Sequence, residues 1–116
     1  MRILLDHNIP AFVRSVLPEA VTAHFLGWHE LSNGRLLDAA ERDGFKLLAT
    51  FDRGFLVDHD LSERNISVAV LSPVDQSKPA ILATANVLSQ MISEIVPGHI
   101  LLVSGNTGEP GSVPQT

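Results

Sequence analysis

Residues 1–10, MRILLDHNIP, join a short apolar run to a carboxylate. Residues 3–5 are apolar at successive positions, which is typical of a parallel-sheet strand that is covered on both faces. Asp6 follows this run directly, and Pro10 suits the first turn of a helix. The stretch therefore predicts a buried strand that presents a carboxylate at its carboxyl end, followed by a helix that ends at Pro18.

Apolar segments recur along the chain and predict further strands. The segment FKLLATFD is an apolar run that again ends in a carboxylate, Asp52. The segment ISVAVLS is rich in β-branched residues and stops just before Pro73, as expected of a strand. The candidate strands beyond the first are residues 20–28 (AVTAHFLGW), 45–52 (FKLLATFD), 66–72 (ISVAVLS) and 99–104 (HILLVS).

Further segments have helical periodicity. In residues 80–96 the apolar side chains recur at steps of four and three, which predicts an amphipathic helix. In residues 31–44, LSNGRLLDAAERDG, Ser32 or Asn33 can cap a helix and Gly44 can end it. Strands that alternate with helices in this way predict an α/β fold, with a parallel or mostly parallel sheet and helices on both faces.

The composition is that of a globular protein. The chain has 116 residues, of which 45% are hydrophobic, and this suits one domain with a sizeable core. We expect this domain to span residues 1–104. Residues 105–116, GNTGEPGSVPQT, hold too little apolar surface to order themselves, so we expect a disordered tail.

Composition also excludes several classes of function. The chain has no cysteine, so it has no disulfide framework, thiolate metal site or cysteine nucleophile, and a reducing, cytoplasmic setting fits it. No apolar run approaches the ~18 residues of a membrane span, and the first residues begin a strand pattern rather than a secretory signal. The net charge of −5 argues against a broadly electrostatic nucleic-acid binder, but not against a nuclease whose acids bind metal ions.

Asp6 and Asp52 are candidate functional residues because each follows a predicted strand. In parallel sheets flanked by helices, ligands bind outside the carboxyl ends of the strands. Two ionised carboxylates at neighbouring strand ends repel each other unless a cation joins them, and oxygen-only ligands suit Mg²⁺ or Mn²⁺. An ion held there can activate water for attack on a phosphodiester. Each Asp alone is equally compatible with a turn or a helix cap.

The segments MRILLDHNIP, GWHELSNGRLLDAAERDGFKLLATFDRGF and ISVAVL together resemble a PIN-like nuclease-fold family of short bacterial and archaeal proteins. The similarity covers residues 1–72. It implies a three-layer α/β/α sandwich with a mostly parallel central sheet, and a Mg²⁺- or Mn²⁺-dependent endoribonuclease. It also implies the role of the toxin in a toxin–antitoxin pair, so the expected partners are RNA and a small antitoxin protein. The apolar face of the predicted helix of residues 80–96 suits either the core of one chain or the interface of a homodimer.

The resemblance also implies which residues form the site. Asp6 matches the first acid of the family and Asp52 the later one, so both are expected to be catalytic and to bind the metal. Asn8 and Asn33 are expected to support the metal, since an amide oxygen can also ligate a hard cation. Relatives commonly carry an acid where Asn33 stands, and many carry a second acid close to the position of Gly54.

Asp38 is a candidate substitute for the missing third acid. Helical spacing speaks against this role, because it puts Asp38 on the face opposite Leu36 and Leu37, four residues before Arg42. An exposed ion pair between Asp38 and Arg42 is the simpler interpretation.

Other functions remain open at this point. The missing acids favour a catalytically degenerate PIN-like binding or interaction module. A phosphoacceptor receiver domain would also place Asp residues at strand ends and a Lys-Pro pair later, as in Lys78-Pro79. Receivers usually carry adjacent acids after the first strand, however, and here His7 follows Asp6. The RNA target, its cleavage site, the antitoxin and the oligomeric state are not encoded in any recognisable pattern.

Overall fold

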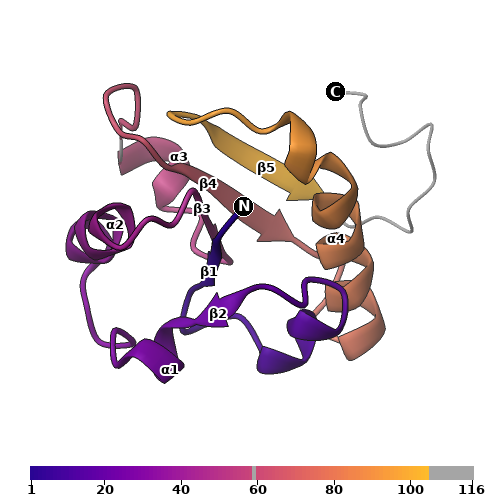
Figure 1. The fold of residues 1–116 in the computed structure, drawn as a ribbon. Coiled ribbons are helices and arrows are strands. Elements are labelled where there is room, and N and C mark those ends of the chain that lie inside the picture. The colour runs from indigo at the N-terminus through magenta and orange to yellow at the C-terminus, as the bar shows by residue number, and fades with distance from the viewer. Residues whose placement is uncertain (59, 105–116) are drawn as a thin grey trace.

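The computed structural model describes residues 1–58 and 60–104. Within them, five parallel strands form one sheet in the order β2-β1-β3-β4-β5 (Figure 1). This all-parallel sheet confirms the predicted α/β class. The strands are β1 (Ile3–Leu5), β2 (Val21–Thr22), β3 (Leu47–Thr50), β4 (Ser67–Ser72) and β5 (Ile100–Ser104).

Helices cover both faces of the sheet and complete a three-layer α/β/α sandwich (Figure 1). Side chains alternate along each strand, so the strands bury apolar residues on both faces. Leu4 and Leu48 pack with α1, α2 and α3, whereas Leu5 and Leu47 pack with η1 and α4. The helices are α1 (Ala23–Leu26), α2 (Asn33–Arg42), α3 (Phe55–Asp58) and α4 (Lys78–Met91), and the 3₁₀ helices are η1 (Ala11–Ser15) and η2 (Ile92–Glu94).

Most of the predicted elements are confirmed, although the strands are shorter than their apolar segments. β1, β3, β4 and β5 lie inside the predicted ranges, and α2 and α4 form where the helical periodicity is clearest. In α2 the buried residues are Leu36, Leu37 and Ala40. Continuous burial along β1 and β3 explains why residues 3–5 and 47–49 are apolar at every position rather than alternating.

In the segment 20–28 a strand forms at Val21–Thr22 and the helix α1 follows at Ala23–Leu26, so the prediction as a strand is wrong beyond Val21–Thr22. The Thr22 hydroxyl accepts a hydrogen bond of 3.1 Å from the backbone N–H of Phe25 and thereby caps α1. Gly27, with φ of 77°, ends that helix in the left-handed conformation that glycine tolerates. A local cap and a glycine therefore override the apolar pattern.

The helix predicted after Pro10 is a 3₁₀ helix, η1, rather than an α-helix. Its buried residue is Val13, which joins the core on the α4 face of the sheet. The predicted tail, residues 105–116, lies outside the described residues. No helix in the described part of the chain is both long enough and apolar enough to cross a membrane.

The strand order reverses direction next to β1. The chain passes from β1 to β2 on one side of the sheet, and then returns across β1 to form β3 on the other side. In open α/β sheets the crevice at such a reversal, outside the carboxyl ends of the strands, is where ligands bind. The fold therefore directs attention to the residues that follow β1 and β3.

Candidate functional site

Asp6 is buried at the carboxyl end of β1. Its backbone N–H donates to the carbonyl of Ala49 at 2.9 Å, which extends the pairing of β1 with β3 by one residue. Only 4% of Asp6 is exposed. Its Oδ1 accepts a hydrogen bond of 2.7 Å from the backbone N–H of His7 and lies 3.1 Å from Nδ1 of the same residue. Its Oδ2 accepts a hydrogen bond of 2.7 Å from the Thr50 hydroxyl.

Thr50 links the segment after β1 to the segment after β3. Its fully buried hydroxyl donates to Asp6 and accepts from the backbone N–H of Asp52 at 3.0 Å. The Asn8 side-chain amide also contacts this hydroxyl, at 3.4 Å. One hydroxyl group thus fixes the positions of both acid-bearing loops relative to each other.

Asp52 is half-buried in the turn between β3 and α3. Its Oδ1 accepts a hydrogen bond of 2.8 Å from the backbone N–H of Gly54, and its Oδ2 accepts one of 2.8 Å from the Asn33 amide nitrogen. Asn33 is the first residue of α2, so the positive end of that helix dipole lies beside the Asp52 carboxylate. Hydrogen-bond donors from the Asn33 side chain and the Gly54 backbone thus hold both oxygens of this carboxylate.

The structure brings together Asp6, Asn8, Asn33 and Asp52, all of which were predicted site residues. They lie in one hydrogen-bonded network centred on Thr50. The Asn8 oxygen, however, accepts from the backbone N–H of Phe51 at 3.2 Å, so this amide binds the chain rather than facing outward. Asn8 therefore acts as a positioning residue in this network.

Asp38 does not join the network. Its carboxylate accepts a hydrogen bond of 2.9 Å from Nη1 of Arg64, which contacts Glu41 at the same distance. The side chain of Asp38 is 57% exposed. The ion-pair interpretation of Asp38 is thus supported, but its partner is Arg64 rather than the expected Arg42.

The carboxylate oxygens of Asp6 and Asp52 are donors of the type that a hard divalent cation prefers. Mg²⁺ characteristically takes one or two carboxylates while keeping several waters. Among residues 1–58 and 60–104, no group of three or more His, Asp or Glu side chains that could hold a metal is found. An ion here would accordingly depend on the Asp6 and Asp52 carboxylates, with water or substrate oxygens completing its shell.

The sequence reasoning missed Ser72, which ends β4 at the same edge of the sheet. Arg53 donates to the Ser72 hydroxyl at 3.3 Å. The available signal was the one that identified Asp6 and Asp52, namely a polar residue directly at the end of an apolar strand. The central position of Thr50 is evident only from the register of β1 with β3.

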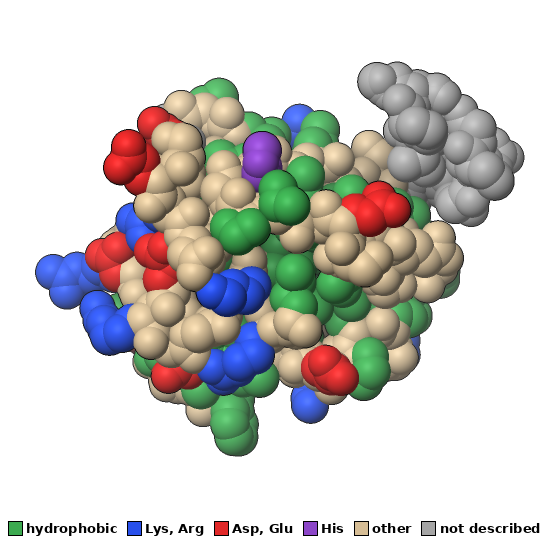
Figure 2. Space-filling model, turned by 45° about the horizontal axis from the view of Figure 1, so that its top comes forward, with side chains coloured by type: hydrophobic (Ala, Val, Ile, Leu, Met, Phe, Trp, Pro, Cys, Tyr) green, Lys and Arg blue, Asp and Glu red, His purple; other side chains and the backbone are tan. Residues whose placement is uncertain are grey.

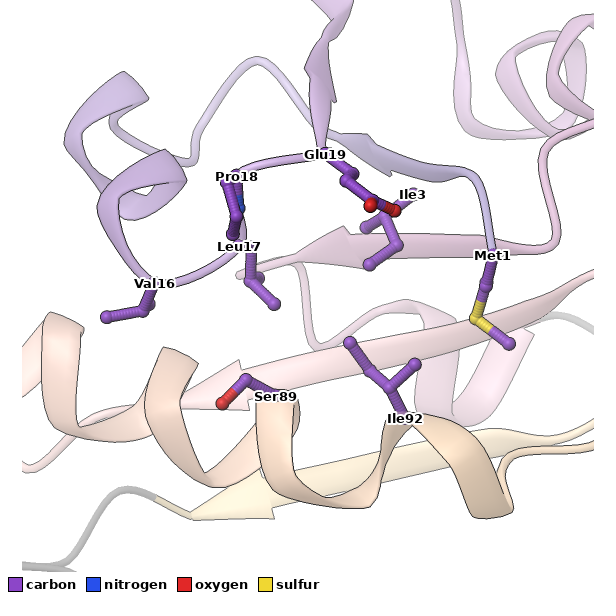
Figure 3. Close-up of a pocket in the computed structure, with 8 residues that line it drawn as sticks. All are labelled: Met1, Ile3, Val16, Leu17, Pro18, Glu19, Ser89 and Ile92. Carbon is purple, nitrogen blue, oxygen red and sulfur yellow. The ribbon is translucent and has the colours of Figure 1, made fainter.

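An apolar hollow lies away from these acids. Met1 and Ile3 place it at the amino end of β1, and Ile92 closes it from the α4 side (Figure 3). Its volume is about 250 Å³. The lining residues are Met1, Ile3, Val16, Leu17, Pro18, Glu19, Ser89 and Ile92, and none of them belongs to the Thr50 network.

The surface charges are interspersed. Figure 2 shows one face of the molecule on which hydrophobic side chains gather in the middle, with positive and negative side chains around them. This face carries no broad basic field, in keeping with the net charge of −5. Recognition of a polyanion would therefore depend on a few specific cations rather than on a general field.

No family model, no curated protein and no solved structure matches this chain.

Proposed function

We propose that this protein is a PIN-like, metal-dependent endoribonuclease that cleaves RNA phosphodiester bonds in the cytoplasm. We further propose that it is the toxin of a toxin–antitoxin pair and is held inactive by a small antitoxin protein. The observation that carries the proposal is the hydrogen-bonded network in which Thr50 joins Asp6 to the Asp52 segment. This network lies where the strand order reverses, which is the ligand position of open α/β sheets.

Asp6 and Asp52 would hold Mg²⁺ or Mn²⁺, with Asn33 beside them. When bound, such an ion supplies a Lewis acid that lowers the pKa of water and neutralises charge on a phosphodiester. Asn33 keeps the Asp52 carboxylate oriented through its 2.8 Å hydrogen bond. The preference for oxygen ligands favours Mg²⁺ or Mn²⁺ over softer metals.

The other residues of the network position the acids. The Thr50 hydroxyl and the His7 backbone N–H each hold one oxygen of Asp6. The His7 ring is 56% exposed and touches Asp6, so it is placed to exchange protons between the site and solvent. Ordered acids of this kind keep their geometry before substrate arrives, which lowers the cost of binding the transition state.

RNA cleavage by purified protein tests this proposal. Asp6→Asn and Asp52→Asn should each lower Mn²⁺-dependent cleavage of RNA by more than about 100-fold, since even supporting residues of metal sites can cost that much. Asp38→Asn is the matched control because Asp38 is also an acid near α2 but pairs with Arg64. Undiminished cleavage by the double variant Asp6→Asn with Asp52→Asn would refute the nuclease function.

A catalytically degenerate binding module is the second candidate function. What favours it is the neutral Asn33 at the position where an acid is expected, together with the engaged oxygen of Asn8. Calorimetric titration with Mn²⁺ separates the two functions. The nuclease requires Mn²⁺ binding that disappears in the double variant, whereas the binding module predicts no binding by the wild type.

A phosphoacceptor function ranks below both. The strand order is shared with receiver domains, which supports it. The Lys78 ammonium group, however, lies 5.1 Å from the centre of the Phe12 ring and so packs against η1. Failure to incorporate phosphate from a small phosphodonor would remove this candidate.

A further inference from the structure

Arg53 lies beside the acids of the candidate site. It follows Asp52 directly, and its Nη1 donates a hydrogen bond of 3.3 Å to the hydroxyl of Ser72. Ser72 is the last residue of β4, which pairs with β3 in the sheet. The guanidinium group therefore lies across the carboxyl ends of β3 and β4, on the opposite side of Asp52 from β1.

The turn that carries Arg53 is well supported by hydrogen bonds. The Asp52 carboxylate accepts from the backbone N–H of Gly54 at 2.8 Å, and the Arg53 carbonyl accepts from the backbone N–H of Leu56 at 3.0 Å. These bonds hold the backbone of residue 53 next to the acidic network.

Arg53 retains most of its hydrogen-bonding capacity for another ligand. A guanidinium group carries five N–H donors and a permanent positive charge. Among the described residues, the arginines found in ion pairs are Arg2 and Arg64, and Arg53 is exposed with a neutral hydroxyl as its partner. An exposed arginine that directly follows Asp52 and is engaged by one neutral hydroxyl is suited to bind an anion at this end of the sheet.

We propose that Arg53 and Ser72 form a phosphate-binding subsite for the RNA nucleotide next to the bond that is cleaved. The inference rests on the proposed function, because that function makes RNA the ligand. The planar guanidinium group matches two oxygens of a phosphodiester, and the Ser72 hydroxyl can donate to a third atom of the same nucleotide. A cation at this place also offsets the repulsion between RNA and the acids at Asp6 and Asp52.

Binding of a fluorescent single-stranded oligoribonucleotide, measured by anisotropy in EDTA, tests the subsite without cleavage. Arg53→Gln should weaken binding about tenfold, as expected for the loss of a charged hydrogen bond. It should also lower the slope of log Kd against log salt concentration by about 0.7, the value for one phosphate contact on a single strand. Arg53→Lys keeps the positive charge but loses the planar pair of N–H donors. Its affinity for the oligonucleotide should lie between those of the wild type and Arg53→Gln.

Arg42→Gln is the matched control. Arg42 is likewise exposed, but it ends α2, whereas Asn33 at the start of that helix contacts Asp52. The control should bind RNA like the wild type. Equal weakening by Arg53→Gln and Arg42→Gln would overturn the subsite, and so would a wild type that does not bind the oligonucleotide.

Cleavage assays on the same variants separate this inference from the proposed function. RNA binding that depends on Arg53 in a wild type that cleaves nothing would support RNA-phosphate binding by Arg53 and refute the nuclease. Cleavage that depends on Asp6 and Asp52, combined with a KM that Arg53→Gln leaves unchanged, would support the nuclease and refute the subsite. If both hold, Arg53→Gln should raise KM more than it lowers kcat, because the subsite binds ground state and transition state alike.

Discussion

The hydroxyl of Thr50 donates a hydrogen bond of 2.7 Å to Oδ2 of Asp6, although 44 residues separate them in the sequence. The same oxygen atom of Thr50 accepts from the backbone N–H of Asp52 at 3.0 Å. A β-branched residue at the end of a central strand therefore connects the acids that the fold places at the reversal of strand order.

Replacement of Thr50 should destabilise the protein through Asp6. Thr50→Val keeps the shape but removes the donor to a buried carboxylate, and we expect a loss of about 1–3 kcal/mol in the free energy of unfolding. Thr50→Ser, which keeps the donor, should cost less. Urea unfolding at neutral pH provides the measurement. Equal stability of the Val and Ser variants would show that this hydrogen bond contributes little.

Asn33→Asp should strengthen metal binding. The substitution exchanges the amide that donates to Asp52 for another carboxylate beside it, which adds negative charge and a hard ligand. We expect tighter Mn²⁺ binding by calorimetry and, without metal, a lower Tm because the carboxylates repel each other.

Asn86→Asp serves as the control for this charge change. Asn86 is exposed on α4, and its side chain contacts Ser89 rather than any residue of the Thr50 network. Mn²⁺ affinity should stay at the wild-type value in this variant. A gain in affinity in both variants would mean that net charge, and not a ligand at position 33, controls the binding.

The Arg64 ion pairs should contribute to stability unequally. Glu41 accepts from the Arg64 guanidinium group and, at 2.6 Å, from the backbone N–H of Asn65, and its side chain is 25% exposed. Asp38 is more exposed, and within the described part of the chain its carboxylate bonds only with Arg64. Glu41→Gln should therefore lower the free energy of unfolding by about 1 kcal/mol, and Asp38→Asn by less.

Neither of these substitutions should alter Mn²⁺ binding or RNA cleavage. Chemical denaturation gives the stability difference, and the cleavage assay gives the activity. A strong loss of activity in Asp38→Asn alone would restore Asp38 as a third acid of the site.

Asp75 should make part of the stability depend on pH. Hydrogen bonds from the hydroxyl and the backbone N–H of Ser77 hold the pKa of this carboxyl below its ordinary value of 3.8. A carboxyl whose pKa is lower in the folded state stabilises the protein above its unfolded pKa and loses this effect as the pH falls through the folded pKa.

Asp75→Asn removes this titration. The wild type should have the higher Tm near neutral pH, and the difference in Tm between wild type and variant should shrink below about pH 4. Thermal unfolding followed by circular dichroism across this range provides the test. A difference that stays constant with pH would exclude a contribution from the Asp75 charge.

Much of the fold followed from local patterns. Residues 3–5 and 47–49 are apolar at every position because both of their faces are covered, and that property is visible in the sequence. The segment 20–28 was misjudged because an apolar run does not distinguish a strand from a short helix. The Thr22 cap and Gly27 determine that residues 23–26 form a helix.

The sequence by itself determined that Asp6 and Asp52 follow buried strands of an α/β fold, since strand burial and strand ends are local properties. Only the tertiary structure decided how their surroundings are built. The bond between Thr50 and Asp6 depends on the register of β1 with β3, and that between Asn33 and Asp52 depends on where α2 packs. The partner of Asp38, 26 residues away, was likewise decided by packing. These contacts join distant segments whose relative placement follows from the packing of the whole core, and no pattern of neighbouring residues encodes them.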